Sequence, residues 1–126
     1  MKDFQELVVW QKSHALTLEV YRATKAFPRD ELYGLTSQMR RSAASVPTNI
    51  AEGCGRRSGD VEFKRFLEIA LGSATELEYQ LILAHDLAYI SKDDHRHLSS
   101  LLTESKRMLV SLIQKLNPTQ KLAARS

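Results

Sequence analysis

Nonpolar residues recur at alternating intervals of three and four along several separate segments of the chain. The longest series is Phe63, Leu67, Ala70, Ala74, Leu77, Leu81, Ala84 and Ala88. A later series is Leu98, Leu102, Ser105, Leu109, Leu112 and Leu116, and an earlier one is Leu32, Leu35, Met39, Ala43, Val46 and Ile50. This spacing keeps each series on one side of a helix, so each segment is predicted to be an amphipathic helix with a buried seam.

The first segment differs because it carries two nonpolar stripes. One stripe consists of Leu7, Trp10, His14, Leu18 and Tyr21. The other consists of Val9, Leu16, Val20, Ala23 and Phe27. Two stripes on one helix predict two buried faces.

Helix-breaking and capping residues separate these segments. Pro28 disfavours helical geometry at Phe27, so the first helix ends there, and Asp30 is expected to cap the second. The glycine-rich stretch 53–59 ends the second helix, and Ser58 or Asp60 is expected to cap the third. Ser91 and Asp94 have the spacing of a capping box at the start of the fourth.

These signals predict helices over residues 5–26, 31–53, 59–88 and 92–117, with no strand. Short connections make consecutive helices antiparallel neighbours. The expected fold is therefore all-α, an antiparallel up-down-up-down four-helix bundle over residues 1–118. The polar residues 119–126 are expected to form a flexible tail.

Pro47 lies inside the second helical pattern. It cannot donate the hydrogen bond to the carbonyl of Ala43, which costs about 3 kcal/mol or kinks the helix. Small residues surround it, namely Ser42, Ala44, Ser45, Thr48 and Ala51. They permit close approach of another backbone, either within the chain or from a second subunit.

Composition narrows the class of protein. The chain has 126 residues, 43% of them hydrophobic and 26% charged, as in one globular domain. A net charge of +3 permits a polyanionic partner without requiring one. Its single cysteine, Cys54, excludes an intramolecular disulfide and suits a reducing cytoplasm. No nonpolar run approaches the ~20 residues of a membrane span, so a cytoplasmic protein is expected.

The stretch GCGRRSG at 53–59 resembles a phosphate-binding loop only superficially. A P-loop needs a Gly-Lys-Ser/Thr ending and a preceding strand, and both are missing. A connection between helices is the better interpretation. Gly53 or Gly55 is expected to adopt the left-handed conformation that closes a helix.

Arginines form two predicted basic zones. Arg56 and Arg57 lie with Lys64 and Arg65 at one end of the bundle, whereas Arg40 and Arg41 lie about 20 Å further along the second helix. They either contact phosphates or form surface pairs with Glu52, Asp60 and Glu62. A further basic excess occurs late in the chain, where Glu104 is the acid opposing Lys106, Arg107, Lys115, Lys121 and Arg125.

The sequence gives little evidence for a catalytic or metal-binding group of residues. His95 and His97 are two residues apart and so point to different helix faces. The Glu-x-x-His motif of di-iron bundles does not occur. A site joining His14, His85 and Asp86 is a remote alternative, and nothing marks Cys54 as a nucleophile. We therefore expect no catalytic residue, no metal, no cofactor and no enzymatic activity.

Several motifs together resemble a known family. They are FQELVVWQ at 4–11, FP at 27–28, GL at 34–35, QMRRS at 38–42, VPTNIAEG at 46–53, FKRFL at 63–67, ALGS at 70–73 and ELE at 76–78. In this order they are similar to proteins encoded in intervening sequences of 23S ribosomal RNA genes. The accessory variability determinant proteins of diversity-generating retroelements look like a branch of that family.

The resemblance implies a homopentameric ring of antiparallel bundles. It also implies that the accessory branch binds a reverse transcriptase and nucleic acid through basic surfaces. If the resemblance extends to these surfaces, it implies that the nucleic-acid-binding residues of this chain are Arg40, Arg41, Arg56 and Arg57, with Lys64 and Arg65.

Together, these observations predict a non-enzymatic, oligomeric bundle. It is expected to bind RNA or DNA by neutralising phosphates, or to assist a nucleic-acid-processing protein. The alternative is a protein–protein interaction scaffold that makes no contact with nucleic acid.

Overall fold

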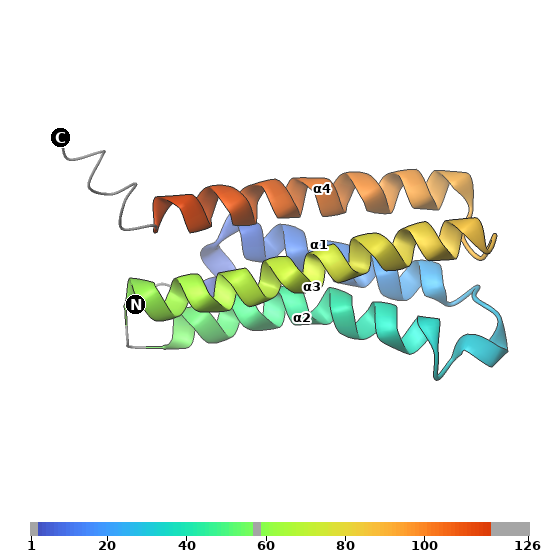
Figure 1. Cartoon of the computed structure of the whole chain (residues 1–126), viewed down its shortest axis with the longest axis horizontal. Helices are drawn as coiled ribbons and strands as arrows, with labels where there is room; N and C mark the ends of the chain where they lie inside the picture. Colours follow the sequence, from blue (N-terminus) through green and yellow to red (C-terminus); the bar gives the residue numbers. More distant parts are fainter. Residues whose placement is uncertain (1–2, 57–58, 117–126) are drawn as a thin grey trace.

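The computed structural model describes residues 3–56 and 59–116 and contains four long helices (Figure 1). They are α1 (Val8–Thr24), α2 (Leu35–Gly55), α3 (Asp60–Asp86) and α4 (Lys92–Lys115), with short 3₁₀ turns η1 (Phe4–Glu6) and η2 (Arg29–Glu31). The described ranges contain no strand, so the predicted all-α class is confirmed. The predicted domain boundary at 118 and the tail 119–126 lie outside the described residues.

Consecutive helices run antiparallel, and this confirms the up-down-up-down arrangement (Figure 1). α1 packs against α2 and α4, and α3 packs against the same two helices, so α1 and α3 are diagonal to one another. The α2–α3 connection lies at one end of the bundle, and the α1–α2 and α3–α4 connections lie at the other.

The core consists of the predicted seams with few changes. The buried nonpolar residues of α2, α3 and α4 are Leu35, Met39, Ala43, Val46, Ile50, Phe66, Leu67, Ala70, Ala74, Leu77, Leu81, Ala84, Leu98, Leu102 and Leu109. Two predicted seam positions are wrong. Leu32 is exposed because it precedes α2, and Ala88 is exposed because α3 ends at Asp86.

Ala88 occupies the turn that closes α3. Its φ is 61°, in the left-handed region, and the amide of Tyr89 donates to the carbonyl of Ala84 at 2.9 Å. A second bond joins the amide of Ala88 to the carbonyl of His85 at 3.0 Å. This is the Schellman pattern, in which glycine is the usual residue at the left-handed position.

Of the two stripes on α1, the chain buries one. Val9, Leu16 and Val20 of the second stripe face the core. In the first stripe Leu18 is 57% exposed and Tyr21 is 43% exposed. Leu7 and Trp10 of this stripe are half-buried against the core, but His14, Leu18 and Tyr21 are exposed, so the prediction of two buried faces is wrong for the isolated chain.

α2 continues through Pro47 because α1 supplies the missing hydrogen-bond donor. The hydroxyl of Thr17 donates to the carbonyl of Ala43 at 3.0 Å, and that carbonyl is the one that an amide at position 47 would have satisfied. The same hydroxyl also donates to the carbonyl of Ser13 at 2.8 Å, so its one proton is shared between the two carbonyls. A small residue nearby, Ser45, bonds to Ser73 of α3 at 2.8 Å, so part of the small-residue surface is used within the chain.

The helix starts were predicted less well. Asp30 lies in η2 and does not cap α2; the carboxylate of Glu31 instead accepts a bond from the amide of Leu35 at 3.2 Å. The N-cap of α3 is Gly59, with φ 88°, and Asp60 is already the first residue of that helix. The other proposed cap, Ser58, lies outside the described residues. The cap at Ser91 is confirmed, because its hydroxyl accepts from the amide of Asp94 at 3.1 Å.

Gly53 and Gly55 do not close α2 in the left-handed conformation, since the helix runs through both. Gly53 is required for a different reason. A Cβ atom there would lie 2.9 Å from side-chain carbons of both Phe63 and Phe66 on α3. The backbone of α2 therefore approaches α3 closely where the two helices meet near their connection.

Candidate nucleic-acid interface

The end of the bundle where α2 passes into α3 gathers two of the predicted arginines. The guanidinium carbon of Arg56 lies 5.2 Å from the centre of the Phe66 ring, and that of Arg65 lies 4.9 Å from the same centre. The ring itself is buried. Cation–π contacts of this kind hold both guanidinium groups at the surface of one ring. We call Arg56, Lys64 and Arg65 the basic tip.

Carboxylates partly neutralise the basic tip. Arg56 bonds to Glu52 at 3.1 Å, and Arg65 bonds to Glu62 at 2.6 Å. The hydrogen bond to Glu62 raises the pKa of Arg65, and the same bond lowers the pKa of the Glu62 carboxyl. Two of the surface pairs expected from sequence therefore form. Both are solvent-exposed, and such pairs contribute about 0–1 kcal/mol, so a competing anion can replace the carboxylate.

The predicted zone also includes Lys64 and Arg57. Lys64 is half-buried on the first turns of α3, beside Arg65. Arg57 lies outside the described residues.

Arg40 is bound to α1 and does not join the basic tip. Its Nε donates to the hydroxyl of Thr24 at 2.9 Å, and its Nη2 donates to the carbonyl of Tyr21 at 3.4 Å. The guanidinium also lies 4.8 Å from the centre of the Tyr21 ring. These contacts place a cation at the carboxyl end of α1, where the helix dipole favours positive charge.

Arg41, the next residue, lies on the side of α2 that adjoins α3. It lines a polar groove of about 570 Å³ between α2 and α3, together with Ser42, Ser45, Ser73 and Glu76. Within residues 3–56 and 59–116 it forms no ion pair. Of the two neighbouring arginines, Arg41 is therefore the one able to bind an external anion.

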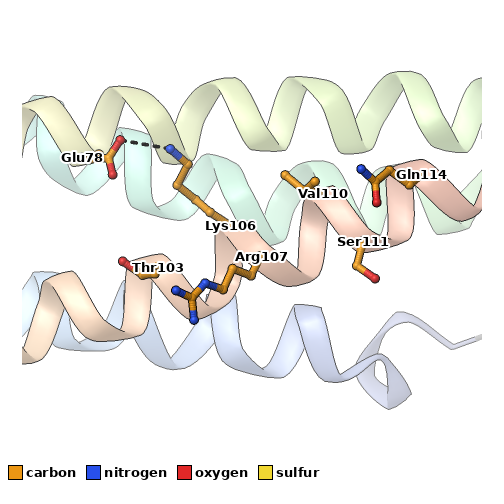
Figure 2. A pocket seen from close by; sticks show the side chains of 7 residues that line it. All are labelled: Glu78, Thr103, Lys106, Arg107, Val110, Ser111 and Gln114. Atoms are coloured by element: carbon orange, nitrogen blue, oxygen red, sulfur yellow. Dashed lines mark hydrogen bonds and ion pairs between the residues drawn. The ribbon is translucent and has the colours of Figure 1, made fainter.

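The outer face of α4 holds a basic surface that the proposed site residues do not include. Lys106 bonds to Glu78 of α3 at 3.0 Å, and Arg107 points away from that pair (Figure 2). The excess of cations after residue 105 was the sequence signal for this surface. It could not show which cation is paired, because the partner of Lys106 lies on a different helix. Lys121 and Arg125 lie outside the described residues.

The four histidines make contacts in different parts of the bundle and do not form one site. His14 stacks on Trp10 with ring centres 5.0 Å apart, whereas His85 stacks on His95 at 4.3 Å. Since α1 and α3 are diagonal, the structure does not bring His14 together with His85. His97 lies 4.0 Å from Glu19 of α1, so His95 and His97 point to different faces, as expected from their spacing.

Metal-ligating side chains do not cluster in the described ranges: no group of three or more His, Cys, Asp or Glu residues is arranged to hold an ion there. A separate finding concerns membranes. No helix among the described residues combines the length and the nonpolar character needed to cross a bilayer.

Comparison with known proteins identifies the family. Residues 5–111 match the model of the 23S rRNA-intervening sequence protein, a range that begins before α1 and ends within α4. The chain belongs to this family. The predicted family is thus confirmed, while the relation to retroelement accessory proteins stays a prediction.

A solved structure supports the same assignment. This member of the 23S rRNA-intervening sequence family is similar to a protein of unknown function from the S23 ribosomal protein family of Bacteroides thetaiotaomicron VPI-5482. The two are 28% identical, with a TM-score of 0.75, over 84% of this chain and 98% of the other. No curated protein gives a significant match.

Proposed function

We propose that this protein is a non-enzymatic, oligomeric bundle that binds RNA or DNA through phosphate contacts from surface arginines. The observation that carries the proposal is the basic tip, where Arg56 and Arg65 rest on one buried ring in exposed positions. Their guanidinium groups contact this ring before an anion arrives, which reduces the conformational entropy lost on binding. Our proposal includes Lys64 of the basic tip, Arg57, which follows Arg56 in the sequence, and Arg41 as a second contact.

The family assignment supports a nucleic-acid role. Its description links the family to an intervening sequence of 23S ribosomal RNA, and the similar solved structure carries the name of a ribosomal protein family. We infer that the protein acts in the cytoplasm on a structured nucleic acid, alone or with a nucleic-acid-processing protein. Phosphate contacts would position it with little reading of base sequence.

Self-association would strengthen this binding. The stripe containing Leu18 and Tyr21 on α1 leaves nonpolar area uncovered, which supports contact with further copies of the chain. Our proposal is a homopentameric ring. Each added copy repeats the basic tip, and each neutralised phosphate adds to the salt dependence of binding.

The test is binding of labelled RNA and DNA duplexes, measured by fluorescence anisotropy between about 50 and 200 mM salt. We expect a steep loss of affinity with salt, and at least a tenfold loss, about 1.4 kcal/mol, in the double variant Arg56→Glu/Arg57→Glu. The matched control is Lys25→Glu/Arg29→Glu, which makes the same charge change at the opposite end of the bundle. Binding that is independent of salt, or equal losses in both variants, would contradict phosphate recognition by the basic tip.

A protein-interaction scaffold is the second candidate, and it is favoured by the pairing of Arg56 and Arg65 with carboxylates. In that case the protein binds neither duplex at any salt concentration. Partners recovered from a lysate would then remain bound after nuclease treatment.

A further inference from the structure

A nonpolar groove with a cationic rim lies between the start of α1 and the last turns of α4. Its volume is about 360 Å³, and its nonpolar lining includes Leu7, Val8, Met108 and Leu112. The nonpolar side chain of Val8, the first residue of α1, is 51% exposed. We call this the α1–α4 groove.

The rim of the α1–α4 groove carries Arg107 and Lys115. They are eight residues apart on α4, or about 12 Å along the helix axis. Neither of these two side chains forms an ion pair with any residue in the described ranges. The lining of the groove contains no carboxylate. On α3 and α4, Glu104 is bonded to Lys12 at 3.2 Å and Glu78 to Lys106 at 3.0 Å. Glu6, which precedes Leu7, does not line the groove.

A second groove beside α4 differs because a carboxylate, that of Glu78, lines it. It lies between α3 and α4, and the Glu78–Lys106 pair crosses it (Figure 2). Arg107 and Ser111 line both grooves, but in Figure 2 they point to the side of α4 opposite Val110. Unpaired positive charge is therefore concentrated toward the α1–α4 groove.

We propose that the α1–α4 groove binds an acidic amphipathic helix of a partner protein. Nonpolar side chains spaced three or four residues apart would enter between Val8, Met108 and Leu112, as in other helix-in-groove complexes. Carboxylates about two turns apart would pair with Arg107 and Lys115. This inference does not depend on nucleic-acid binding by the basic tip, which is a different part of the surface.

The lining favours such a helix over nucleic acid. A phosphate backbone gains nothing from a nonpolar floor, and the groove is lined by no aromatic ring on which a base could stack. The chain's own residues 117–126 adjoin the groove in sequence, but they contain Lys121 and Arg125 and no acidic side chain. Their charge has the same sign as the rim.

The test uses the full chain and three synthetic helical peptides of equal length. The first has leucines at three- and four-residue spacing with glutamates elsewhere, the second replaces the glutamates with lysines, and the third replaces the leucines with serines. We expect the first alone to bind, with NMR shifts confined to Val8, Met108, Leu112 and their neighbours. Arg107→Glu/Lys115→Glu should weaken binding at least tenfold, whereas Lys25→Glu/Arg29→Glu should leave it unchanged.

Other outcomes would overturn the proposal. Equal binding of the lysine peptide, shifts elsewhere on the bundle, or full affinity in Arg107→Glu/Lys115→Glu would each exclude it. The same shifts produced by an RNA duplex would assign the groove to nucleic acid. A fall in sedimentation mass in Val8→Asp would assign it to contact between copies, and tighter peptide binding after removal of residues 117–126 would assign it to the chain's own end.

Discussion

Single residues set how closely the helices approach and in what register. Thr17 supplies the hydrogen bond that Pro47 cannot, and Gly53 removes a Cβ atom that would collide with two phenylalanines. Neither role was readable from sequence, because each depends on an atom contributed by another helix. The sequence did identify Pro47 as a break in the helical hydrogen-bond pattern, but not the residue that compensates for it.

Replacing Thr17 by Val should lower the free energy of unfolding by about 1–3 kcal/mol, because the buried carbonyl of Ala43 loses its donor. In a Pro47→Ala background the same change should cost less, since an amide at position 47 can bond to that carbonyl. Urea unfolding of both singles and the double variant measures the coupling. Thr75→Val is the control: Thr75 is exposed and bonds to a carbonyl of its own helix. An equal loss in both backgrounds would contradict the compensation.

Two glycines should respond in opposite directions to alanine. Gly53→Ala forces Phe63 and Phe66 to move and should cost about 1–3 kcal/mol of stability. Gly72 lies in the interior of α3 with nothing within 4 Å of an added Cβ, so Gly72→Ala should stabilise by about 0.5–1 kcal/mol. Thermal unfolding of the two variants under one set of conditions compares them. Loss of stability in Gly72→Ala would show that its surface is covered by another copy.

At the level of helices, nonpolar periodicity was the reliable signal. All of the buried residues Met39, Ala43, Val46 and Ile50 were predicted from spacing alone. Periodicity could not tell whether the second stripe of α1 faces this chain or another, since it records nonpolar character and not the neighbour. The basic zones had the same limitation: charge spacing grouped Arg40 with Arg41, yet their side chains face different helices.

The end of the bundle where α3 passes into α4 should make stability depend on pH, because His95 of α4 packs there against His85 of α3. Burial, followed by the nearby His85, lowers the pKa of His95, while Asp86 acts in the opposite direction. The folded state thus disfavours the charged ring, and the unfolded chain binds the proton more readily. The contribution of His95 is complete above its unfolded pKa of about 6.5 and is lost as pH falls below that value.

Urea unfolding of the wild-type chain at pH 7.5 and 5.5 should show this loss, and His95→Gln should reduce it. Charged and titratable groups at this end of the bundle include His85 and Asp86 on α3, Asp93, Asp94 and His97 on α4, and Glu19 and Arg22 on α1. They remain in both proteins, and His85, which stacks on the His95 ring, is the one whose surroundings change in the variant. An unchanged difference between the two pH values in His95→Gln would refute the role of this ring.

At the scale of the whole molecule, the uncovered stripe of α1 predicts association. Leu18→Glu places a charge in the centre of that stripe and should reduce the mass found by sedimentation toward the 14.3 kDa of one chain. Ile82→Glu is the matched control, because Ile82 is 50% exposed on α3. If Ile82→Glu dissociates the assembly and Leu18→Glu does not, the contact between copies lies on α3. A single-chain mass for the unmodified protein at micromolar concentration would exclude the ring altogether.

The proline in α2 also bears on how the bundle opens. When α1 detaches, α2 keeps its own helical bonds, but the carbonyl of Ala43, which has no helical donor because of Pro47, also loses the hydroxyl of Thr17. Local unfolding of α1 therefore weakens the middle of α2 directly. Amide hydrogen exchange in the central turns of these two helices should consequently occur as one cooperative event.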